Sequence, residues 1–140
     1  MRKHPARLSA AGISPARYDE LRAICRQYRE CKRRLAWAHA GIVDRPERRS
    51  SAWHRPDPTG NTALALADHP DARRVKLIEQ CAAAVAEPVI ARCLIKYVTE
   101  GKAWEYQTPQ PPIGRNQFYV TAQRFFIELD RSLLESTLRG

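Results

Sequence analysis

Residues 89–130 read VIARCLIKYVTEGKAWEYQTPQPPIGRNQFYVTAQRFFIELD, and this stretch decides the fold. Apolar residues at three- and four-residue spacing predict a helix that ends at Gly101, a residue typical of helix C-termini. Residues 102–106 fit one short helical turn. The segment 108–113 excludes a helix, because its prolines remove backbone donors. Another helix should begin at about residue 114. This order of helix, short helix, turn and helix is that of a helix-turn-helix.

The last helix is expected to continue to about Leu138 and to have one apolar and one polar side. Its apolar stripe consists of Phe118, Ala122, Phe125, Leu129 and Leu133. The side chains predicted to contact DNA bases are Arg115, Asn116, Gln117, Gln123 and Arg124. Such side chains match purine edges in a major groove. Tyr119 and Thr121 carry hydroxyls suited to phosphates. Any helical bundle can end in an amphipathic helix, so a purely structural role stays open.

The N-terminal part is predicted to be basic and extended. Residues 1–13 read as a flexible basic tail, and residues 14–56 as a long basic amphipathic helix followed by a basic loop. Ser14 and Pro15 fit the cap and first position of that helix, which should continue to about Ala40. The predicted DNA-backbone contacts from this region are Arg22, Arg26, Arg29, Lys32, Arg33 and Arg34 on the helix and Arg45, Arg48, Arg49 and Arg55 in the loop. Trp53 either pins the loop to the core or stacks on bases.

Residues 57–140 are predicted to form the helical core, with the helix-turn-helix at about 89–130. A short helix should begin at Asp57 with Pro58 at its first position, and a further helix should cover about residues 70–86. Neither region shows a pattern typical of strands. The sequence therefore predicts an all-α, single-domain bundle of five or six helices.

The positive charge is concentrated in the N-terminal part. The 140 residues have a formal net charge of +9 and a sequence pI near 9.9. Residues 1–55 contain 14 Lys and Arg against 5 Asp and Glu, whereas residues 56–140 contain 10 of each kind. Such asymmetry favours a polyanionic partner. A solvated basic helix that only aids solubility is the alternative.

Other patterns exclude several classes of protein. The cysteines at positions 25, 31, 81 and 93 are separated by 6, 50 and 12 residues, which does not fit a zinc motif. We therefore predict small buried hydrophobes, a reducing compartment and no metal. No apolar run suits a signal peptide or a bilayer-spanning helix. The chain also lacks a glycine-rich phosphate loop and the zinc motif HExxH. We expect a non-enzymatic protein without cofactor in the bacterial cytoplasm, with no membrane association.

Three stretches resemble small phage and prophage late-gene transcription activators of the ArpU/RinA type, which have a helix-turn-helix similar to the fourth conserved region of sigma factors. They are SPARYDELRAICRQY with RECKRRL at residues 14–35, DPTGNTA at 57–63, and residues 94–129 from LIKYVTEG to RFFIEL. The resemblance implies DNA contacts from Arg115, Asn116, Gln117, Tyr119, Gln123 and Arg124. Two features depart from the family: Gly114 stands where Ser or Thr usually caps the last helix, and the turn is longer and rich in proline.

The function predicted from these observations is sequence-specific binding of double-stranded DNA in transcriptional regulation, with RNA polymerase or another protein as a further partner. One alternative is a phage accessory protein or host-defence inhibitor that binds protein or RNA through the same fold. A second is a small DNA-packaging recognition subunit, which would assemble as a ring. The sequence leaves the oligomeric state open.

Overall fold

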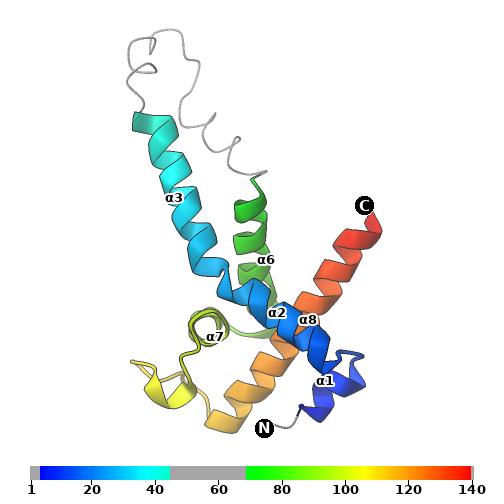
Figure 1. The fold of residues 1–140 in the computed structure, drawn as a ribbon. Coiled ribbons are helices and arrows are strands. Elements are labelled where there is room, and N and C mark those ends of the chain that lie inside the picture. The colour runs from blue at the N-terminus through cyan, green and yellow to red at the C-terminus, as the bar shows by residue number, and fades with distance from the viewer. Residues whose placement is uncertain (1–3, 45–68, 140) are drawn as a thin grey trace. The chain divides into compact units, whose positions relative to one another are not determined.

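The computed structural model describes residues 4–44 and 69–139, and it is all-α over this part of the chain, with no strand. The predicted all-α class is thereby confirmed. In chain order the elements are α1 (Ala6–Ala10), α2 (Pro15–Arg26), α3 (Tyr28–Asp44), α6 (Pro70–Val85), α7 (Pro88–Glu100), the 3₁₀ turn η2 (Trp104–Tyr106) and α8 (Arg115–Arg139) (Figure 1). None of the described helices is long and apolar enough to cross a bilayer.

Contacts divide the chain into two units, which are described separately. The first consists of the residues up to Gln27 together with those from Leu77 onward, and the second extends from Tyr28 to Lys76. The first unit contains α1, α2, α7, η2, α8 and the C-terminal part of α6. In it, α2 packs on both α7 and α8, while α1 and η2 also contact α8.

The described part of the predicted tail is folded. Residues 6–10 form α1, and the side chains of Leu8 and Ile13 are completely or almost completely buried. The His4 ring donates a hydrogen bond from Nε2 to the carbonyl of Ile13 at 2.8 Å, which joins both ends of the segment. Prediction of a flexible tail was therefore wrong for residues 4–13. The buried side chains of Leu8 and Ile13 anchor this segment. Two apolar residues give no helical periodicity, so the sequence pattern did not predict the anchoring.

The predicted N-terminal helix is divided in two. Ser14 caps α2 as expected, with its hydroxyl accepting from the backbone N–H of Arg17 at 3.1 Å. However, α2 ends at Arg26, and Gln27 has φ −81° and ψ −7°. The next helix, α3, then continues to Asp44, beyond the predicted end near Ala40. No proline or glycine marks the break, and the apolar spacing continues across it, so periodicity predicted one helix.

The largest fully buried side chains of the first unit, Phe118 and Phe125, belong to α8. The predicted stripe is confirmed at Phe118, Ala122, Phe125 and Leu129, which are each at most 4% exposed, whereas its last residue, Leu133, is half-buried. Leu94 of α7 and Leu21 of α2 are fully buried as well. At the edge of the core, the guanidinium of Arg17 donates from Nε to the carboxylate of Asp130 at 2.6 Å. The resulting ion pair connects α2 with α8.

Replacing Asp130 with Asn is expected to lower the free energy of unfolding by about 1–2 kcal/mol, since a charge-assisted bond in a partly shielded position is removed. The side chain of Asp130 is 15% exposed and that of Arg17 is 29% exposed. Urea unfolding followed by circular dichroism measures the change. The matched control is Glu20→Gln, because Glu20 also pairs with Arg17 but is 63% exposed. Equal effects of the two substitutions would contradict the proposed weight of the interhelical pair.

The four cysteines are free and buried, which confirms the prediction of small hydrophobes. Burial raises the pKa of the Cys25 thiol to about 12, with a smaller contribution from the nearby Cys81. Burial also raises the pKa of Cys31 and of Cys81. Among the described residues, no cluster of His, Cys, Asp and Glu is suited to hold a metal ion.

Candidate nucleic-acid interface

The connection between α7 and α8 is tied to both helices. Gly101 ends α7 in the left-handed conformation, with φ 74°, and its N–H donates to the carbonyl of Tyr97 at 2.9 Å. The indole of Trp104 donates to the carbonyl of Ile113 at 2.9 Å, across the proline-rich segment. The buried amide of Gln107 donates to the carbonyl of Cys93 in α7 at 2.9 Å. These bonds hold the beginning of α8 against the end of α7.

The first three turns of α8 expose most of the side chains that were predicted to contact bases. Asn116, Gln117 and Arg124 are exposed. Arg115 is also exposed, with its Nε 2.7 Å from the carboxylate of Glu105 in η2. Phe118 lies on the opposite side of the helix and is fully buried, which fixes how α8 is rotated. A set of polar side chains therefore faces outward at the N-terminal end of a firmly packed helix.

Gln123 is less exposed than the other four side chains that are predicted to contact bases. Its side chain is half-buried, and its Oε1 accepts a hydrogen bond from Nε of Arg7 in α1 at 3.2 Å. This bond lies at the surface, where water competes with it and its net contribution is small. A contact from Gln123 to a base would require the Arg7 side chain to move.

The two hydroxyls predicted to bind phosphates have partners inside the chain. Thr121 is 5% exposed and donates to the carbonyl of Gln117 at 2.8 Å, so the predicted DNA contact of Thr121 is wrong. Its position on α8 adjoins the buried aromatic stripe. The hydroxyl of Tyr119 accepts from the backbone N–H of Trp104 at 3.2 Å, and its ring lies 5.4 Å from that of Tyr97. Tyr119 thus helps to hold η2 and α7 in place.

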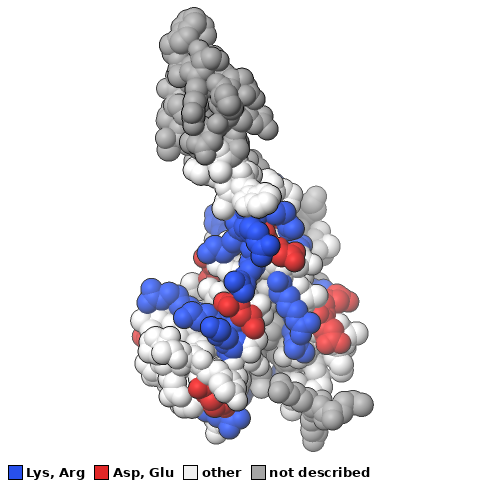
Figure 2. All heavy atoms as spheres, turned by 60° about the vertical axis from the view of Figure 1, so that its left-hand side comes forward, with Lys and Arg blue, Asp and Glu red and all other residues white. Residues whose placement is uncertain are grey.

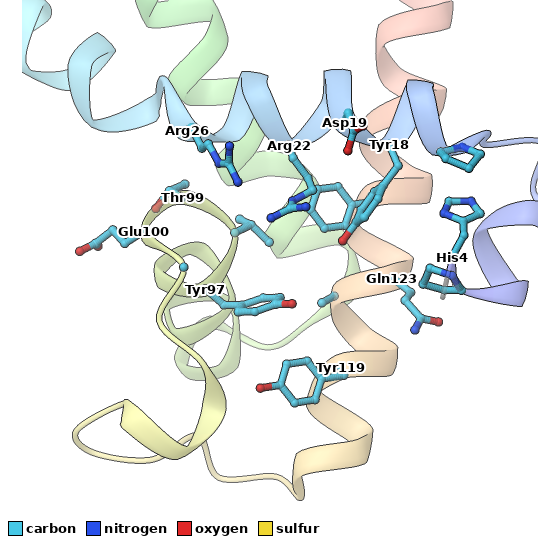
Figure 3. Close-up of a pocket in the computed structure, with 16 residues that line it drawn as sticks. His4, Tyr18, Asp19, Arg22, Arg26, Tyr97, Thr99, Glu100, Tyr119 and Gln123 are labelled. Carbon is cyan, nitrogen blue, oxygen red and sulfur yellow. The ribbon is translucent and has the colours of Figure 1, made fainter. Parts of the chain in front are cut away.

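A cavity of about 690 Å³ brings predicted residues of α2 and α8 together. Arg22 and Arg26 line it from α2, and Tyr119 and Gln123 line it from α8 (Figure 3). The guanidinium of Arg22 lies 5.5 Å from the centre of the Tyr18 ring. Within the described residues, neither Arg22 nor Arg26 has an ion-pair partner. Two of the arginines predicted to contact the DNA backbone therefore lie beside α8, the helix predicted to contact the bases.

The remaining predicted cations of the helical region belong to the second unit. Arg29, Lys32 and Arg33 are exposed on α3. Arg34 differs, because its guanidinium donates to both carboxylate oxygens of Asp71, at 2.8 and 3.0 Å. This bond holds the pKa of Asp71 at about 2, below its usual value. Arg34 is therefore engaged with a carboxylate, and the Lys32 ammonium lies 5.3 Å from the centre of the Tyr28 ring.

Several predictions lie outside the described residues. They are the loop contacts Arg45, Arg48, Arg49 and Arg55, the role of Trp53, and the short helix from Asp57. In the described part, basic side chains are prominent on the face drawn in Figure 2, with acidic side chains among them. The surface is thus basic but interrupted by acidic groups.

Sequence reasoning assigned no functional role to most of the side chains that line the cavity, among them His4, Tyr18 and Tyr97. Both tyrosines keep the three- and four-residue spacing of the apolar side of their helices, and such a residue has the same spacing whether it lies beside a cavity or in the core. His4 was part of the predicted tail. No family profile, no curated protein and no solved structure matches the chain.

Proposed function

We propose that the chain binds double-stranded DNA in a sequence-specific manner and regulates transcription. One observation carries the proposal: Arg115, Asn116, Gln117 and Arg124 are exposed at the N-terminal end of a helix whose other side is locked in the core. Arg, Asn and Gln form paired hydrogen bonds with guanine and adenine in the major groove. In helix-turn-helix proteins it is the N-terminal part of the second helix that contacts base edges.

Affinity would come from a different set of residues. Base contacts specify sequence, while cations that neutralise phosphates supply most of the binding free energy. Arg22 and Arg26 adjoin α8 and lack ion-pair partners among the described residues, which supports a role at the DNA backbone. Arg29, Lys32 and Arg33 of the second unit would add further contacts.

The biological setting rests on the resemblance of residues 14–35, 57–63 and 94–129 to ArpU/RinA-type activators. It supports regulation of phage or prophage late genes in the cytoplasm of a bacterial host, with RNA polymerase or another protein as a further partner. The phage setting rests on the resemblance alone. The proposal of DNA binding is also supported by the exposed polar side chains of α8.

Selection of bound fragments from a double-stranded genomic library, at about 0.15 M salt, tests the proposal because non-specific binding is weakened there. We expect one sequence motif to be enriched. Absence of any motif would reject sequence-specific binding and favour a protein- or RNA-binding module. Light scattering in the same buffer tests the packaging alternative, since a ring would have many times the 16.0 kDa mass of the chain.

Replacing Arg26, Arg29 and Arg33 together with Gln is expected to flatten the salt dependence of DNA binding. For every phosphate that the variant no longer neutralises, the slope of log K against log salt should become shallower by about 0.9. Fluorescence anisotropy with a selected duplex at several salt concentrations measures the slope, and the preferred sequence should stay the same. An unchanged slope would refute the proposal that arginines of α2 and α3 neutralise DNA phosphates.

A further inference from the structure

The cavity beside α8 has the size of a small-molecule site. Its volume of about 690 Å³ lies within the range of about 300–1,000 Å³ found for ligand pockets. The N-terminal segment, α2, the end of α7 and α8 all contribute to its lining. Figure 3 shows Tyr18 and Arg22 extending from α2 towards Tyr97 of α7, with Tyr119 of α8 beyond it.

One wall of the cavity is cationic. Arg22 and Arg26 are four residues apart on α2, so their side chains leave the same face of the helix. Like charges at this spacing destabilise a helix slightly, and within the described residues no carboxylate forms an ion pair with either of them. Two guanidinium groups on one wall provide the planar, multiple donors that bind phosphate well.

The aromatic side chains of the cavity are held in fixed positions. The ring of Tyr97 lies 5.7 Å from that of Phe118 and 5.4 Å from that of Tyr119. Tyr18 packs edge-on against Phe126 at 5.0 Å. Rings that are already ordered lose little conformational entropy when a planar ligand stacks on them. Stacking of a base on an aromatic side chain contributes about 1–3 kcal/mol.

Polar groups complete the lining. Asp19 lies about one turn before Arg22 on α2, Glu100 lies at the end of α7, and Gln123 extends from α8. Carboxylates accept hydrogen bonds, and a carboxamide both accepts and donates them. The presence of two carboxylates argues against a simple anion as the ligand. They fit a ligand that combines one anionic group with a ring bearing hydrogen-bond donors.

We infer that this cavity binds a nucleotide, with the phosphate at Arg22 and Arg26 and the base among the tyrosines. The shared chemistry has two sources, a free mononucleotide and an unpaired residue of a nucleic-acid strand. The inference goes beyond groove reading by α8 and holds for the chain without duplex DNA. Because the same arginines are assigned to the DNA backbone, a bound nucleotide should compete with the duplex.

Isothermal titration calorimetry of the full chain tests the inference, with adenosine and guanosine 5′-monophosphates as ligands. Matched titrations use the nucleosides, inorganic phosphate and a single-stranded tetranucleotide. We expect at least one mononucleotide to bind about tenfold or more tightly than both phosphate and its nucleoside, because two sets of contacts combine. A tetranucleotide that binds more tightly still would assign the site to a strand.

The double variant Arg22→Gln/Arg26→Gln should weaken nucleotide binding by about tenfold or more, since it removes hydrogen bonds to a charged phosphate. Both residues are exposed, so the fold should persist, and circular dichroism checks this. The matched control is Arg92→Gln, an exposed arginine of α7 that does not line the cavity. Binding no tighter than that of phosphate, or equal losses of affinity in both variants, would overturn the inference.

Discussion

Replacing Asn116 and Arg124 with Ala is expected to abolish the preference of the chain for its selected DNA site. Both side chains are exposed on α8, on the side away from Phe118 and Phe125. A good paired contact to a purine discriminates against the wrong base by about 1–3 kcal/mol, which is about 5- to 150-fold in the dissociation constant. Each single variant should lose that amount on the selected duplex, while binding to unrelated duplex changes little.

Competition anisotropy with selected and scrambled duplexes measures this preference. The matched control is Arg131→Ala, because Arg131 is exposed on the same helix about two turns beyond Arg124 and already pairs with Glu128. We expect the control to retain the preference. Equal losses of affinity on selected and scrambled DNA would show that the substituted side chains contact phosphates. No loss of affinity would show that another part of the chain contacts the bases.

Replacing Phe125 with Ala is expected to lower the free energy of unfolding by about 3–5 kcal/mol. Its side chain is fully buried, and its ring packs edge-on against that of Phe126 at 5.3 Å. Loss of the ring leaves a cavity at the side of α8 that fixes the orientation of the helix. Urea unfolding measures the change, and the midpoint should fall without a change in cooperativity.

The control for this prediction is Leu134→Ala, nine residues further along α8. Leu134 is 54% exposed, and surface substitutions of this kind usually change stability by less than about 0.5 kcal/mol. If Phe125→Ala cost less than about 1 kcal/mol, the packed side of α8 would not be the one described. The polar side would then not face outward as the DNA proposal requires.

Local chemistry made several boundaries predictable. Ser14 and Pro15 begin α2, Pro88 begins α7, and Gly101 ends it, as cap preferences predict. The apolar stripe of α8 was predictable for the same kind of reason, since spacing of three and four residues places side chains on one helical face. Such signals lie within a few residues of the feature that they predict.

The break at Gln27 had no such local signal. Leu21 and Cys25 are buried on α2 in the first unit, whereas Tyr28 and Cys31 are buried on α3 in the second. All four keep the spacing of one continuous helix, so the division depends on which core each side chain joins. Tertiary contacts decide this, and periodicity alone does not contain them.

The candidate site was predictable in part. Residue type identified Arg115, Asn116, Gln117 and Arg124, and the structure leaves all four exposed. The prediction for Thr121 was wrong because a shift of one position along a helix is enough to turn a hydroxyl from solvent to the core. The Thr121 hydroxyl donates to a carbonyl of its own helix.

Contacts between segments far apart in sequence were beyond the reach of sequence patterns. Arg7 reaches Gln123 across 116 positions of the chain, and Tyr18 and Tyr97 meet at the cavity beside α8. These contacts arise only when α1, α2 and α7 pack around the same helix. They also connect the cavity to the polar side of α8, so a ligand there would affect Gln123 directly.

Mapping of backbone amide shifts by NMR, during titration with the selected duplex, tests whether α8 contacts the DNA. We expect the largest shifts within residues 115–124 of α8, with further shifts around Arg22 and Arg26 of α2. Amides of the α7 residues that face the core should move little. Large shifts elsewhere, with residues 115–124 unchanged on a duplex that binds, would contradict DNA reading by α8.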